Sequence, residues 1–169
     1  MYLDELFNYK NLLMKDLCSS PEIVALVTGK DDPDVPNHGL PYTQIFPFEY
    51  IPETVDEGKT FICFDVDVIQ VPNKTYHALA IYLWVFTHKS RMVDKVGGKR
   101  SIVVDEISVE IDKILNGNRL YGLGELNAGS VERFTPIRDF QGRVLTYYAT
   151  DFNRQPGKKP IPSSRKRGG

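Results

Sequence analysis

Two aspartates, Asp65 and Asp67, are the pair of side chains best spaced for chemistry in this sequence. They alternate with Phe64, Val66 and Val68 in a segment typical of a strand, so both carboxylates point to the same side of it. Paired carboxylates on one face are oxygen ligands for a divalent cation. A third oxygen ligand is not recognisable nearby, and we therefore interpret the pair as the solvated half of a strand face.

A second pattern, Glu57-Gly58-Lys59 with Pro33-Asp34 upstream, matches the PD…ExK arrangement of metal-dependent nucleases. In such a site the carboxylates hold a cation and the lysine polarises the attacking water. That chemistry requires a rigid strand, whereas the central glycine here lies in what reads as a turn. A metal-dependent nuclease that uses Glu57 and Lys59 is therefore kept as the alternative from a different functional class.

The other candidate nucleophiles and metal ligands show no catalytic spacing. His77 and His88 are eleven residues apart on one expected strand, so they face opposite sides and cannot share a metal. Cys18 and Cys63 are expected to be reduced and buried thiols. The sequence contains no Walker motif and no nucleophile elbow. We therefore predict no catalytic centre, no metal and no cofactor, and a protein that is not an enzyme.

The composition is that of an ordinary globular domain. Of the 169 residues, 41% are hydrophobic and 25% are charged, and the net charge of −1 excludes nucleic-acid binding over the whole surface. No basic region precedes an apolar run near Met1, and no apolar stretch reaches about 18 residues. We therefore expect neither a secretion signal nor a membrane segment, and assembly in a reducing cytoplasm.

The last segment, residues 154–169, is basic and rich in proline and glycine, and it carries no core residues. Two interpretations remain open for it. It is either a solubilising end or a contact for a polyanion such as DNA or for an acidic neighbour. The cations of its last dozen residues are Lys158, Lys159, Arg165, Lys166 and Arg167.

The N-terminal half of the chain predicts two helices, an arm and a hairpin. Apolar residues at helical spacing predict helices over 3–18 and 21–29. Proline recurs through 30–59, which predicts an extended arm because proline blocks helices and central strands. Strands are expected over 60–71 and 76–88, and the second is apolar on both faces, so it should be central and covered on each side.

The C-terminal half predicts a charged loop, a helix and a second hairpin. The loop spans 90–99, and an apolar stripe predicts a helix over 101–116. A glycine-rich link then leads to strands near 131–139 and 143–151, with Gln141-Gly142 as the turn between them.

This order of elements predicts one α+β domain over residues 1–153, followed by the basic tail 154–169. The domain is expected to have an antiparallel-rich β-sheet with a long helix packed on one face, together with N-terminal helices and an extended proline-rich arm at 30–59.

Large apolar side chains in the proline-rich arm indicate that it lies against something, either its own core or a neighbouring molecule. The residues we expect at a contact with a neighbouring subunit or with another layer of an assembly are Tyr42, Phe46, Phe48, Tyr50 and Ile51. A second candidate contact is the charged loop, whose cations would attract a polyanion such as DNA. The residues are Lys95, Lys99 and Arg100.

The layout of the whole domain resembles the tail-terminator, tail-completion and neck proteins of long-tailed bacteriophages. The resemblance covers roughly residues 1–153. It rests on an N-terminal helix, the proline-rich segment Ile45–Glu53, the strand TFICFDVDVIQV, the helix VVDEISVEIDKILNG and a closing hairpin that ends at Tyr147–Asn153. The basic tail lies outside this pattern.

The resemblance implies a structural virion protein without catalytic residues, located in the neck or tail. It implies a homo-oligomeric ring, commonly a hexamer, that ends the tail tube and joins it to the head connector. The implied partners are other copies of the chain, the tail tube protein and the head–tail connector protein, with DNA passing through the channel. Another head-completion or neck adaptor is the nearest alternative, and a binding module with a different partner is the next.

Overall fold

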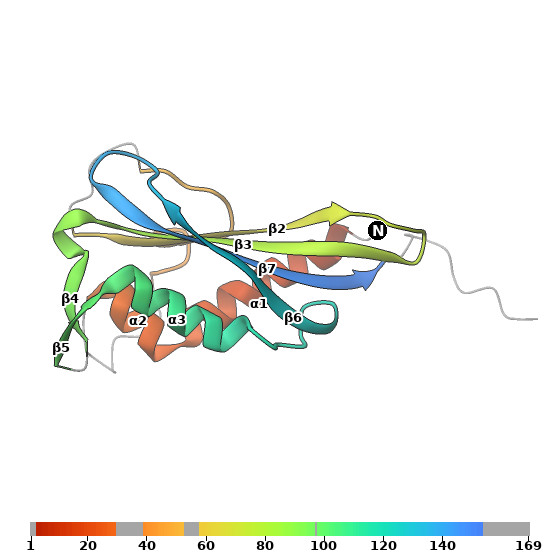
Figure 1. The fold of residues 1–169 in the computed structure, drawn as a ribbon, viewed down its shortest axis with the longest axis horizontal. Helices are drawn as coiled ribbons and strands as arrows, with labels where there is room; N and C mark the ends of the chain where they lie inside the picture. The colour runs from red at the N-terminus through yellow and green to blue at the C-terminus, as the bar shows by residue number, and fades with distance from the viewer. Residues whose placement is uncertain (1–2, 30–38, 53–57, 97, 154–169) are drawn as a thin grey trace, which may run out of the picture.

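The three α-helices in the described part of the chain lie on one side of a five-stranded sheet (Figure 1). The computed structural model describes residues 3–29, 39–52, 58–96 and 98–153. The elements are α1 (Leu3–Ser19), α2 (Pro21–Thr28), β1 (Ile45–Phe46), β2 (Thr60–Gln70), β3 (Tyr76–His88), the 3-10 turn η1 (Lys89–Arg91), β4 (Val93–Val96), β5 (Lys99–Ile102), α3 (Val103–Leu115), β6 (Leu123–Phe134) and β7 (Phe140–Phe152).

The strands follow the order β1-β2-β3-β7-β6, and only β1 pairs in parallel. This confirms the predicted α+β class and antiparallel-rich sheet. The helix predicted to be the long one is α3, but it has 13 residues against 17 in α1, so that detail is not confirmed. Among the described residues, no helix is long and apolar enough to cross a membrane.

Helix boundaries near the N-terminus follow from capping residues. The Ser20 side chain accepts a hydrogen bond from the Ile23 amide at 3.3 Å, and Pro21 occupies the first turn of α2. Gly29 has a φ of 70° and donates its amide to the Ala25 carbonyl at 2.8 Å, which ends the helix in the left-handed conformation. The two predicted N-terminal helices are confirmed.

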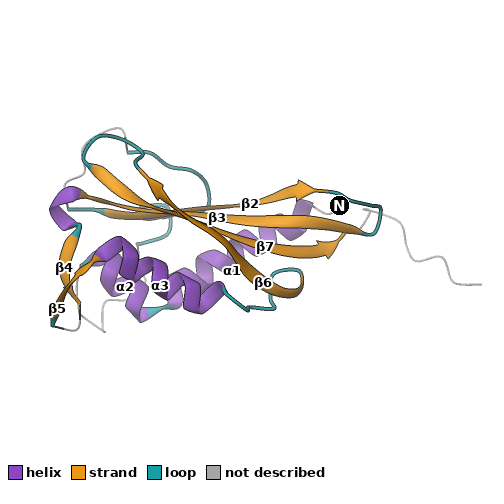
Figure 2. Ribbon diagram, in the orientation of Figure 1, coloured by secondary structure: helices purple, strands orange, loops and turns teal. Residues whose placement is uncertain are grey.

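The strand β3 lies at the centre of the sheet and divides its side chains between two layers. Leu79, Ile81 and Leu83 face the helices and join the main core with apolar residues of α1, α2 and α3. Trp84 and Phe86 face the opposite side, where the proline-rich arm lies. The predicted central strand, apolar on both faces, is confirmed (Figure 2).

The second hairpin differs from the sequence prediction in its position. β6 begins at Leu123, inside the segment we expected to be a link, and the connection to β7 spans 135–139 rather than Gln141-Gly142. The residue that ends this connection, Asp139, has a φ of 71°. The prediction was wrong because Gly142 is needed as a small residue within β7, opposite Phe86, and not as a turn residue.

The charged loop predicted over 90–99 is instead a two-stranded hairpin, β4–β5, beside α2 and α3 (Figure 2). Its second strand takes up Ser101 and Ile102, so α3 starts two residues later than predicted. The arm also contains one short strand, β1, which pairs with Ile62 and Cys63 of β2. The pairing of β1 with β2 is a contact between segments distant in sequence, which local composition does not report, whereas β4 and β5 are consecutive strands within the charged segment.

Two tyrosines form polar links between the helices and the sheet. The hydroxyls of Tyr9 and Tyr147 donate to Asp151 and Asp112 at 2.6 and 3.0 Å and join the helix layer to the sheet. Burial, followed by the neighbouring carboxylate, raises the pKa of both hydroxyls well above the ordinary tyrosine value. Both therefore remain protonated donors and fix the helices on the sheet.

Candidate interaction surface

The proline-rich arm covers one end of the sheet with aromatic rings. Phe46 stacks on Tyr50 with ring centroids 4.1 Å apart, and both rings contact Phe61 of β2. Phe61 in turn packs against Phe86 and Phe140 of β3 and β7. The side chain of Phe46 is therefore buried within its own subunit, and Tyr50 is half-buried.

Three of the five predicted arm contacts project outward instead. Tyr42, Phe48 and Ile51 are 64%, 44% and 43% exposed. Tyr42 also has a φ of 62°, a left-handed conformation that costs a non-glycine residue about 1–2 kcal/mol. The arm thus divides into a part that wraps its own sheet and a part, Tyr42, Phe48 and Ile51, which we call the outer arm surface.

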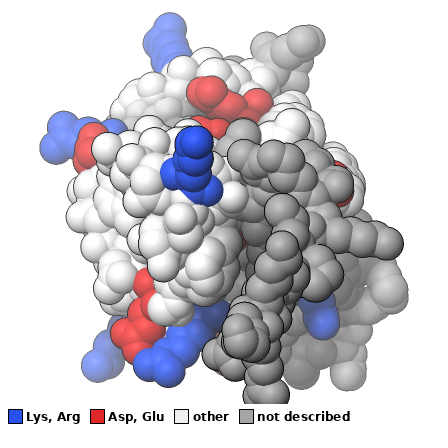
Figure 3. Space-filling view, turned by 90° about the vertical axis from the view of Figure 1, so that its right-hand side faces the viewer, with Lys and Arg blue, Asp and Glu red and all other residues white. Residues whose placement is uncertain are grey.

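The predicted lumen-facing cations lie together on the β4–β5 hairpin. Lys95 is paired directly with Arg100, and Lys99 is opposite Val96. The three cationic residues are exposed. Like charges directly opposite each other destabilise a hairpin. On the end of the molecule drawn in Figure 3, by contrast, basic and acidic side chains are interspersed.

The strand β6 forms the edge of the sheet opposite the arm. It is 12 residues long and mostly exposed, with Val131 at 64%. Among the described residues, no strand pairs with its outer side. A long edge of this kind presents backbone donors and acceptors to another strand.

The sheet side that faces away from the helices carries a second aromatic group, beyond the arm. Tyr82 stacks on Trp84 with ring centroids 6.1 Å apart, and Tyr148 is 42% exposed. A Cβ at Gly129 would overlap the Tyr148 ring, so this ring lies directly over the glycine. We did not predict this surface from the sequence. The alternation of large side chains within β3 and β7 would have indicated it.

The two aspartates predicted to share a strand face do lie in β2 at alternate positions. Asp65 forms an ion pair with Lys10 of α1 at 2.5 Å, and it also accepts the Val66 amide. Within the described residues, no group of three histidines, cysteines or acids is placed to hold a metal. The nuclease residues Glu57, Pro33 and Asp34 lie outside the described residues, as do the cations of the basic tail.

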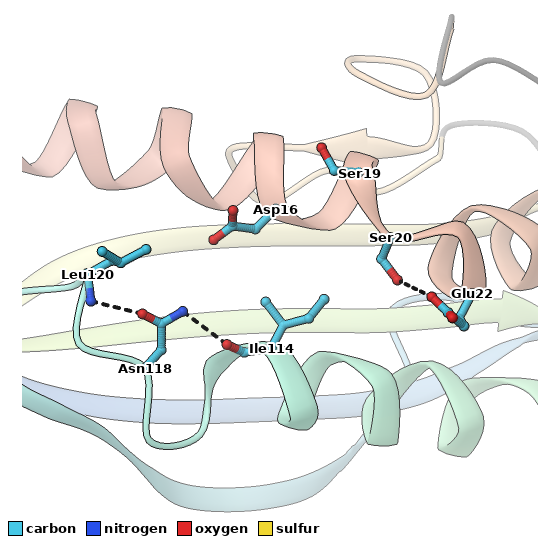
Figure 4. Close-up of a pocket in the computed structure, with 7 residues that line it drawn as sticks. All are labelled: Asp16, Ser19, Ser20, Glu22, Ile114, Asn118 and Leu120. Carbon is cyan, nitrogen blue, oxygen red and sulfur yellow. Dashed lines mark hydrogen bonds between the residues drawn. The ribbon is translucent and has the colours of Figure 1, made fainter.

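A shallow depression lies where α1, α2 and the segment after α3 meet (Figure 4). Its acids already have partners, since Asp16 accepts the Tyr121 hydroxyl at 2.9 Å and Glu22 accepts that of Ser20 at 3.1 Å. Asn118 donates to the Ile114 carbonyl at 3.0 Å and accepts the Leu120 amide. These polar groups therefore satisfy helix ends and turns. The lining residues are Asp16, Ser19, Ser20, Glu22, Ile114, Asn118 and Leu120.

Both cysteines are free and buried thiols, as predicted. Burial raises the pKa of Cys63 to about 12, and it raises the pKa of Cys18 as well. Since the thiolate is the reactive form, we expect the folded protein at pH 8 to leave both cysteines unmodified by an aromatic disulfide reagent. Unfolding in urea should release two reactive thiols, because an unperturbed thiol has a pKa of about 8.5.

The control for this measurement is an exposed cysteine introduced by Lys74→Cys in the β2–β3 turn, which should react at once in the folded state. Reaction of either native cysteine as fast as the introduced one would contradict the burial described here.

Comparison of the sequence with known proteins identifies the family of this chain. A family model described as YomW matches residues 20–149, which is well over half of the chain. No curated protein and no solved structure matches the chain. The matched segment runs from the cap of α2 to Ala149 and so includes every strand of the five-stranded sheet except the last three residues of β7. The chain therefore belongs to the YomW family, a phage-associated family named for the yom locus of SPbeta-like Bacillus phages.

Proposed function

We propose that this protein is a non-enzymatic structural subunit of a long-tailed phage virion. It forms a ring, commonly a hexamer, at the neck, where it terminates the tail tube and joins it to the head connector. Membership of a phage-associated family supports the phage context. The ring and its position in the neck follow from the resemblance to tail-terminator proteins and from the two edges of the sheet.

The observation that carries the proposal is that the two edges of the sheet present different surfaces that are available for contact with another molecule. The outer arm surface (Tyr42, Phe48 and Ile51) lies near β1 at one edge, and the unpaired side of β6 forms the other. A ring subunit needs two unlike surfaces that contact each other between neighbours, because a head-to-tail interface is heterologous. In the ring, the arm of one subunit contacts the β6 edge of the next.

The first experiment measures the mass and shape of the full-length protein by light scattering and negative-stain imaging. We expect closed rings. The triple variant Tyr42→Ser, Phe48→Ser, Ile51→Ser should lose them while keeping its circular dichroism spectrum, because these side chains contribute little to the core. The matched control is Val109→Ser, an apolar side chain on α3 that is 50% exposed and belongs to neither edge.

A protein that is monomeric at every concentration would contradict the proposed ring. Rings that persist in the triple variant would show that the outer arm surface is not part of the interface. Locating the subunit in intact particles then separates a tail terminator from another neck adaptor, since a tail terminator lies on the last ring of the tail tube.

The cations of the β4–β5 hairpin are assigned to the lumen of the proposed ring. There, Lys95, Lys99 and Arg100 meet the phosphates of DNA that passes through the channel. Their reversal to Glu should leave ring formation intact and reduce tail joining or DNA delivery. Unchanged infectivity would show that these residues do not face the channel.

A further inference from the structure

The side of the sheet that faces away from the helices, called here the helix-free side, carries a row of aromatic side chains along β7. Aromatic rings lie at both ends of this row. Phe152 stacks on Tyr76 with centroids 5.6 Å apart, at the end where β7 finishes. Two steps further along, Tyr148 lies opposite Ala80, and beyond it the stacked rings of Tyr82 and Trp84 follow. Trp84 packs against the five-residue cluster that the arm covers, the other rings lie outside that cluster, and all of them remain partly exposed.

Acidic side chains flank the same rings. Asp67 is paired across β2–β3 with Ala80, in the row that contains Tyr148. Glu132 is paired with Val144, in the row that contains Trp84. Both acids are exposed, and no described salt bridge includes either of them, whereas Asp65 is bonded to Lys10. A surface of aromatic rings with unneutralised carboxylates at its margins favours cationic and proline-rich segments.

The chain itself carries such a segment at its C-terminal end. Residues 154–162 contain Pro156, Pro160 and Pro162 together with Lys158 and Lys159, and three more cations follow. The last described residue, Asn153, donates its amide to the Thr75 carbonyl at 2.7 Å, so the segment starts beside Phe152 and Tyr76. It therefore begins at one end of the aromatic surface.

The lengths also agree. From Phe152 to Val144, β7 advances eight residues, which is about 26 Å at about 3.3 Å per residue. Nine residues of polyproline conformation, 154–162, span about 28 Å at about 3.1 Å per residue. If the segment reverses direction after Asn153, Pro160 and Pro162 therefore reach Trp84.

We propose that residues 154–169 fold back over the helix-free side of their own chain's sheet. Pro160 and Pro162 pack on the rings of Tyr82 and Trp84, and the lysines and arginines lie beside Asp67 and Glu132. The same chain supplies the segment because its attachment at Asn153 keeps its local concentration high at this surface. This inference does not depend on ring formation, since a single chain contains both partners.

The test measures energy transfer from Trp84, the only tryptophan of the chain, to a dansyl group on the cysteine introduced by Ser163→Cys. Labelling is selective because Cys18 and Cys63 are buried. We expect efficient transfer at low salt in the full-length protein. It should be largely lost at 1 M salt, where the screening length falls to about 3 Å, and it should be reduced by Asp67→Lys and by Glu132→Lys.

The matched control is Glu110→Lys, which makes the same charge change on α3, on the opposite side of the sheet. It should leave the transfer unchanged. Circular dichroism of each variant verifies that the domain is folded. Weak transfer in the parent protein, or transfer that Asp67→Lys, Glu132→Lys and Glu110→Lys reduce equally, would overturn the proposal.

A second experiment distinguishes docking of the segment on its own chain from docking on a neighbouring chain, even within a ring. Labelled protein that carries Trp84→Phe is mixed with unlabelled protein that retains Trp84. Transfer in this mixture can arise only between two chains. We expect no energy transfer in this mixture. Transfer as strong as in the labelled chain that also retains Trp84 would show that the segment docks on a second copy.

Discussion

Replacing Gly142 with Ala is expected to cost about 3 kcal/mol of folding free energy or more. A Cβ at this position of β7 would overlap the Val85 carbonyl oxygen and lie 2.7 Å from both Cα and Cβ of Phe86. The overlapped atoms include the backbone of the central strand, which is held on both sides by β2 and β7. Overpacking a core costs about 1–3 kcal/mol where side chains yield, and more where backbone must move.

Urea unfolding of the two proteins gives the measurement. The midpoint should fall strongly in Gly142→Ala, with little change in slope if the native state keeps its compactness. Domains of this size have only about 5–15 kcal/mol of stability, so a loss of about 3 kcal/mol removes roughly a fifth to three fifths of it. The control is Gln141→Ala, one residue earlier and exposed. Equal midpoints in the two variants would show that β3 and β7 can separate at this point.

The same glycine explains why the second hairpin was misplaced by our sequence analysis. A Gln-Gly pair between two apolar runs is a turn signal, and the sequence offers no reason to prefer another role. The role emerges only from pairing, because Phe86 comes from a strand more than fifty positions away and needs space opposite it. Hydrophobic periodicity therefore predicted that β6 and β7 exist but not where one ends and the other begins.

The arm illustrates the same limit for the candidate surface. Its aromatic content correctly indicated that it lies against other groups, but not which ring turns inward. Phe46 is buried because β1 pairs with Ile62 and Cys63 and so directs this side chain onto Phe61. Phe48, two residues later, is 44% exposed after the strand has ended. Residue type is the same in both cases, and only the partner strand distinguishes them.

Charged residues in the segment 89–100 were interpreted together as a charged loop and candidate contact, which concealed the structural role of one of them. The side chain of Arg91 is only 15% exposed. Its guanidinium donates to the carbonyls of Leu26, Val27 and Gly58 at 3.2, 3.0 and 3.3 Å. It therefore connects the end of α2, the start of β2 and the β4–β5 hairpin, three segments distant in sequence.

We expect Arg91→Ala to destabilise the protein by about 3 kcal/mol. The substitution removes the Arg91 donor from the Leu26 carbonyl, leaves the Val27 carbonyl with the Gln44 side chain at 3.2 Å, and removes a cation from the negative end of the helix dipole. Hydrogen bonds to a charged group each contribute about 1.5–3 kcal/mol, although several on one side chain do not add fully. Chemical denaturation gives the change, and hydrogen exchange should show the loss concentrated in α2, at the Gly29 amide in particular.

Two further variants make this prediction specific to the guanidinium. Arg91→Lys keeps the charge but presents a single ammonium that cannot reach three carbonyls in a fixed geometry, so it should recover only part of the loss. Arg138→Ala removes a cation whose side chain is 95% exposed and whose ion pair with Asp139 spans 3.9 Å, and it should change stability by less than about 0.5 kcal/mol. If Arg91→Ala behaved like Arg138→Ala, the three carbonyls would have to be solvated in solution, and the connection between α2 and the hairpin would rest on apolar contacts alone.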